Sequence, residues 1–166
     1  MGTLASNRKG FITGTSQANY ASALNVATGT ATDSATGNQN CIQYFRSSGR
    51  GGGTFRFIRT FIHFNTTNLS EASSISLQLT SAGGSNSSNF NVTAIKHSAG
   101  SSNGSQISDS DFNNIDRNTA YSAATSFASS GTITFSLNAA AVEQINNNND
   151  FNIALLLTID ATQSEE

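Results

Sequence analysis

The segment RSSGRGGGTFRFIRTFIHFN, residues 46–65, contains residue types that could bind phosphate or nucleic acid. Glycines beside a cation are typical of phosphate-binding loops, and arginines among glycines resemble segments that bind single-stranded nucleic acid. A phosphate-binding loop of the G-x-x-x-x-G-K-S/T type also needs a lysine, and GRGGGTF has none. A chain with 8 basic and 10 acidic residues exerts no long-range attraction on nucleic acid or an anionic membrane. We therefore expect neither as a partner.

From Phe55 onward the same segment alternates in the manner of a β-strand. Phe57 and Phe61 fall on one face and Ile62 and Phe64 on the other, so both faces are apolar. We expect a long strand that buries these four side chains. The preceding SSGRGGG is then a loop that leads into the strand.

Arg46 and Arg50 are expected to reach outward from this loop. No acidic residue lies between Asp33 and Glu71, so the region is locally positive on a weakly acidic molecule. The predicted use of the two arginines is contact with a carboxylate-bearing neighbouring subunit. The alternative is a solvated loop with no partner.

Oxygen-bearing side chains follow one another closely at Asp109, Asp111, Asn113 and Asp116, as at the start of an EF-hand calcium loop. That loop needs glycine at its sixth position and glutamate at its twelfth, and here asparagine and alanine stand there. Ser108 and Asp111 instead have the spacing of a helix capping box. We expect no metal ion and no other cofactor.

No residue pattern predicts catalysis. His63 and His97 are expected to be strand side chains, since neither adjoins a nucleophile motif. The patterns G-x-S-x-G, H-E-x-x-H and C-x-x-C are absent, and the ten acidic residues offer no evident carboxylate pair of the glycosidase type. Cys41, the only cysteine, is predicted to be a small buried hydrophobic residue. The sequence thus predicts a protein that is not an enzyme.

The composition favours a surface of hydroxyls and amides. Hydrophobic residues make up 36% of the 166-residue chain, enough for the core of one domain, while only 11% are charged. Such a surface tolerates close contact with other polar surfaces. The start MGTLASNRKGF lacks the apolar stretch of a signal peptide, and no segment reaches the roughly 20 apolar residues of a membrane span. We expect a protein made in a cytoplasm.

Short apolar runs separated by Gly, Ser and Asn predict eight strands. Ile75, Leu77 and Leu79 alternate with polar neighbours, which indicates a half-buried antiparallel strand. The run FNIALLLTI is apolar on both faces and predicts a central strand. The eight runs are residues 11–13, 24–28, 41–45, 55–64, 75–79, 90–95, 132–137 and 151–159.

Two short helices interrupt the strands, one in NAAAVEQIN with Asn138 as its cap and one in SDSDFNNI. Residues 1–10 are polar, carry Arg8 and Lys9, and are expected to form an arm ahead of a single domain at residues 11–166. The predicted fold is all-β: a two-sheet antiparallel β-sandwich, or jelly roll, with one or two short helices.

The succession RFIRTFIHFN, SISLQL and FNVTAIKH, with the ending GTITFSLNAAAVEQINNNNDFNIALLLTID, resembles jelly-roll modules of bacterial surface proteins and accessory proteins of phage particles. The likeness covers about residues 40–160 and concerns the pattern of packed side chains. It implies the fold, and it implies a structural protein of a phage virion: a capsid decoration or cement protein, or a short fibre or tail component.

In that role we expect a homo-oligomer, most simply a trimer, because closed symmetric assemblies are the rule. Arg8, Lys9, Arg46 and Arg50 would contact sister subunits, the major capsid protein or other virion proteins. The alternative is a carbohydrate-binding or adhesin-type jelly-roll module that binds host surface glycans. Its stacking aromatics would come from Tyr20, Tyr44 and Tyr121, since the chain has no tryptophan.

Overall fold

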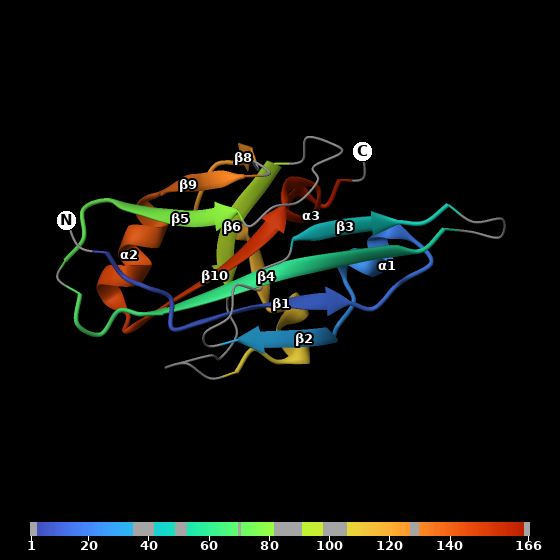
Figure 1. Ribbon diagram of the computed structural model, residues 1–166, viewed down its shortest axis with the longest axis horizontal. Coiled ribbons are helices and arrows are strands. Elements are labelled where there is room, and N and C mark those ends of the chain that lie inside the picture. The colour runs from blue at the N-terminus through green and yellow to red at the C-terminus, as the bar shows by residue number, and fades with distance from the viewer. Residues whose placement is uncertain are drawn as a thin grey trace.

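The computed structural model describes residues 3–34, 42–48, 53–69, 71–81, 91–97, 106–126 and 130–164 (Figure 1). Most of the structure is β-strand, and the paired strands are antiparallel. The strands are β1 (Arg8–Gly14), β2 (Gly29–Ser34), β3 (Gln43–Arg46), β4 (Phe55–Asn65), β5 (Ile75–Ser81), β6 (Asn91–His97), β7 (Ile115–Ala120), β8 (Thr125–Ser126), β9 (Gly131–Leu137) and β10 (Asp150–Leu157). The helices are α1 (Tyr20–Leu24), α2 (Ala139–Asn147), α3 (Thr158–Thr162) and the 3-10 helix η2 (Asp109–Asn113).

The strands form a large sheet and a small one. The large sheet has the order β2-β1-β4-β10-β6-β7, with β3 beside β4 and β8 beside β6, and the small sheet is β5-β9. Figure 1 shows β5 and β9 side by side in a layer of their own. The pairs β4–β10, β5–β9 and β6–β7 are nested along the chain, which is the connectivity of a jelly roll. The predicted two-sheet antiparallel fold with short helices is confirmed.

Both faces of β4 are buried, because each is covered by a different layer. On one face, Phe57 packs edge-on against Tyr20 of α1, with ring centroids 5.5 Å apart, and Arg59 lies over Phe112 of η2. The side chains of Ile58 and Ile62 point to the other face, where both are buried, and Ile62 joins a continuous core with the apolar face of the small sheet. The long strand predicted from the sequence and its buried residues are confirmed, although Phe64 is only partly buried.

β10 lies between β4 and β6, so the prediction of a central strand at FNIALLLTI is also confirmed. The strand ends at Leu157, however, two residues before the predicted end, and α3 begins at Thr158. Both predicted helical segments are present: Asn138 Oδ1 accepts a hydrogen bond from the Ala141 backbone N–H, and Asp111 Oδ2 accepts one from the Ser108 N–H.

Two sequence predictions are wrong near the N-terminus. The arm predicted at residues 1–10 ends too late, because β1 begins at Arg8 and pairs with both β2 and β4. The strand predicted at residues 24–28 is absent: Asn19 caps the short helix α1 there, accepting a hydrogen bond from the Ser22 N–H at 2.8 Å, and β2 starts only at Gly29.

Candidate functional site

The four residues predicted to bind a partner do not lie together. Arg8 and Lys9 are half-buried in β1, where Arg8 lies opposite His63, near the end of β4. Arg46 lies opposite Phe55, at the start of β4. Eight residues of strand separate the two places, or roughly 26 Å. Arg50 and the glycines beside it lie outside the described residues.

The region around Arg46 is an edge of the large sheet with two cross-strand pairs of arginine and phenylalanine. Phe45 is directly opposite Arg56, and Arg46 directly opposite Phe55. The Arg56 Cζ atom lies 5.3 Å from the Phe45 ring centroid, and the Arg46 Cζ atom lies 5.4 Å from that of Phe55. Because neighbouring side chains alternate along a strand, one pair faces each side of the sheet. We call these four residues the β3 edge.

The β3 edge has features that favour contact with another molecule. Among the described strands, β3 pairs with β4 alone, so its other side offers backbone groups to a partner. Phe45 is 40% exposed and is the one aromatic residue among the exposed large apolar side chains in the described part of the chain. The Nε atom of Arg56 is buried without a hydrogen-bond partner in the described part of the chain.

A buried ion network, which the sequence analysis missed, joins β4, β7 and α3. Arg59 donates to both carboxylate oxygens of Asp160, at 2.7 and 2.8 Å, and to the backbone oxygens of Phe112 and Leu24. Arg117 donates to the same carboxylate at 3.1 Å. Burial lowers the pKa of Arg59, while Asp160 opposes that change. Since its nitrogens are paired and solvent is excluded, the network stabilises the fold and offers no group to a substrate.

The two histidines contact structural partners. The His63 Nε2 atom lies 2.9 Å from Asp150 Oδ1, and the ring of His97 lies 4.7 Å from that of Phe61. Burial lowers the pKa of His97 to about 4, so its ring is uncharged at neutral pH. No nucleophile motif adjoins either histidine in the sequence.

The carboxylates of Asp109, Asp111 and Asp116 accept hydrogen bonds from other groups of the chain. Asp109 Oδ1 accepts the Ala31 N–H at 2.7 Å, and Asp116 accepts the Asn118 N–H and the Thr119 hydroxyl. Within the described ranges, no three His, Cys, Asp or Glu side chains gather where a metal ion could bind. The capping interpretation of Ser108 and Asp111 is therefore supported by their geometry.

No helix in the described part of the chain has the length and apolar character needed to cross a membrane. Comparison of the chain with protein-family models, curated proteins and solved structures finds no match in any of the three.

Proposed function

We propose that this protein is a non-enzymatic structural subunit of a phage particle, either a capsid decoration or cement protein or a short fibre or tail component. It acts through protein–protein contacts, and the β3 edge is the surface that makes them. The observation that carries the proposal is Phe45: a large apolar ring, 40% exposed, on an edge strand and directly opposite Arg56. Exposed aromatic rings with neighbouring arginines are the residues that contribute most to protein interfaces.

The partner with the best support is a sister subunit. The chain carries a net charge of −2 and exposes acidic side chains, among them Glu71, Asp109 and Glu143, which can pair with the β3 edge of another copy. The edge and its acceptor would be different surfaces, and a contact of that kind forms a ring such as a trimer when the rotation between copies closes. The low overall charge leaves the β3 edge as a distinct feature of an otherwise polar surface.

Sedimentation velocity tests this assembly. The wild-type protein is expected to sediment with three times the chain mass of 17.3 kDa. Phe45→Ser and Arg46→Glu are expected to sediment as single chains with unchanged circular dichroism, because both side chains are exposed. Leu69→Ser is the matched control, since Leu69 is 45% exposed and lies outside the β3 edge. A wild-type monomer, or trimers of both edge variants, would refute the role of the β3 edge.

The role in a particle needs a separate measurement. Virions purified through a density gradient from infected host cells should contain the chain in a fixed ratio to the major capsid protein. Its absence from such virions would refute the proposed location and leave the assembly result intact.

A further inference from the structure

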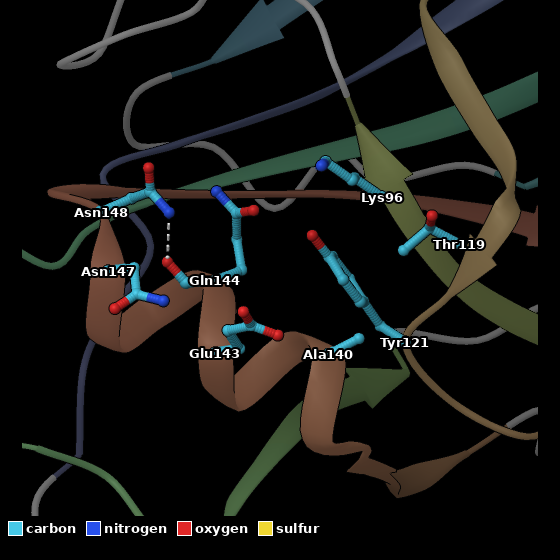
Figure 2. Close-up of a pocket in the computed structure, with 8 residues that line it drawn as sticks. All are labelled: Lys96, Thr119, Tyr121, Ala140, Glu143, Gln144, Asn147 and Asn148. Carbon is cyan, nitrogen blue, oxygen red and sulfur yellow. Dashed lines mark hydrogen bonds between the residues drawn. The ribbon is translucent and has the colours of Figure 1, made fainter.

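A polar pocket lies between α2 and the β6–β7 side of the large sheet (Figure 2). Its volume is about 300 Å³, at the lower end of the range for small-molecule sites. Figure 1 shows α2 near one end of the long axis and β3 in the other half, and no residue of the β3 edge lines the pocket. The lining residues are Lys96, Thr119, Tyr121, Ala140, Glu143, Gln144, Asn147 and Asn148.

Tyr121 is the residue that points to a ligand. Only 1% of its surface is exposed, yet its hydroxyl has no hydrogen-bond partner among the described residues. Figure 2 shows this hydroxyl directed toward the space between Gln144 of α2 and Lys96 of β6. Buried hydroxyls without a partner are rare in folded proteins because the lost hydration is not replaced. A bound molecule with an oxygen acceptor would complete this hydrogen bond.

The pocket is rigidly held on the Tyr121 side. The Tyr121 N–H donates to the Ala94 backbone oxygen at 2.8 Å, and its own backbone oxygen accepts the Asn138 N–H at 2.8 Å. Its ring packs on Phe151, with centroids 5.2 Å apart. Burial raises the pKa of Tyr121 to about 12, with Asp116 adding to the effect, so the hydroxyl keeps its proton at neutral pH. It is a fixed hydrogen-bond donor.

The lining selects for an uncharged molecule with several hydroxyls. Lys96 and Glu143 balance each other in formal charge, so neither an anion nor a cation is favoured. The amides of Gln144, Asn147 and Asn148 supply donors and acceptors together, which suits hydroxyl groups that also do both. Most of the lining is polar, which disfavours a purely apolar ligand.

We propose that this pocket binds a single neutral sugar ring, with the Tyr121 hydroxyl and the Gln144 amide hydrogen-bonded to its hydroxyls. The site goes beyond the assembly role, and neither depends on the other. It also changes the expectation for the carbohydrate-binding alternative. Tyr20 and Tyr121 are buried and Tyr44 is partly buried, so recognition at the pocket uses hydrogen bonds in place of the exposed stacking tyrosines expected from the sequence.

Two-dimensional NMR of the ¹⁵N-labelled full chain tests this site, with glucose, galactose and N-acetylglucosamine as probes and inorganic phosphate as the anionic comparison. At least one sugar should shift the amide signals of α2 and of residues 119–121, with a dissociation constant on the order of 1 mM for a ligand of this size. Phosphate should leave these signals unchanged. Shifts confined to other residues, no shifts with any of the three sugars, or shifts with phosphate alone would overturn the proposal.

Three variants assign the binding to the named groups. Tyr121→Phe removes only the unpaired hydroxyl, so the melting temperature should stay the same or rise while sugar affinity falls by about 10-fold. Gln144→Ala should also weaken binding. The matched control is Gln78→Ala, since Gln78 is exposed on β5 outside the pocket. Full affinity in both pocket variants, or equal loss in the control, would overturn the assignment.

Discussion

Asp160 and Arg59 are joined by two hydrogen bonds, of 2.7 and 2.8 Å, although 101 residues separate them in the chain. Their side chains are 2% and 0% exposed. The pair connects α3, which follows the last strand, to the centre of β4. Because Arg117 and two backbone oxygens join the same cluster, four separate elements depend on one carboxylate.

We predict that Asp160→Asn lowers the free energy of unfolding by about 3–5 kcal/mol, since it leaves the buried charge of Arg59 without its partner. Urea denaturation followed by circular dichroism measures the change. Glu71→Gln, at an exposed position, is the matched control and should stay within about 0.5 kcal/mol of the wild type. A loss below about 1 kcal/mol for Asp160→Asn would contradict the role given to this network.

The buried ring of His97 predicts a dependence of stability on pH. Its pKa is about 4 in the folded protein, below the 6.5 of a histidine exposed to water, so the unfolded state binds the proton more tightly. The uncharged His97 ring therefore makes its full contribution to the free energy of unfolding above pH 6.5. That contribution is lost as the pH falls toward 4, and the free energy of unfolding decreases by about 3 kcal/mol in all. Urea unfolding of the wild type and of His97→Gln between pH 7 and pH 4 tests this. If the free energy of unfolding falls equally with pH in the wild type and in His97→Gln, His97 is not the source of the pH dependence.

Gly14 allows the aromatic ring of Phe112 to pack against β1. A Cβ atom at position 14 would lie 2.5 Å from Phe112 Cζ, and Phe112 cannot retreat because it is fully buried beneath Arg59. Gly14→Ala should cost about 1–3 kcal/mol by urea denaturation. The same substitution made in a Phe112→Leu background should cost less, because the smaller side chain leaves room. If Gly14→Ala lowers the free energy of unfolding equally with and without Phe112→Leu, the loss does not come from contact with the Phe112 ring.

The parts of the fold that were predictable are those carried by local patterns. Alternation at Ile75, Leu77 and Leu79 indicated β5, and the cap at Asn138 indicated α2. β7, with the sequence IDRNTA, has only two apolar residues and depends on pairing with β6, so nothing local marked it. Helix α1 spans only five residues, and a run of that length does not show helical periodicity.

The sites depend on contacts between distant segments, which explains why they were found only in part. Arg46 was recognised from the local excess of positive charge, but its pairing with Phe55 needed the register of β3 on β4. Asp160 looked like a residue at the end of an apolar strand, and Arg59 like one side chain of an alternating strand. The pocket draws Lys96 from β6, Gln144 from α2 and Tyr121 from the residues after β7, and no spacing in the sequence connects them.

Hydrogen–deuterium exchange of β3 tests the proposed assembly surface most directly, when it is measured above and below the concentration at which the assembly dissociates. We predict slow exchange of residues 43–46 in the associated protein and fast exchange in the single chain, with β10 equally protected in both because it is central in the sheet. Equally fast exchange of β3 at both concentrations, or new protection confined to another surface, would contradict the β3 edge as the contact between subunits.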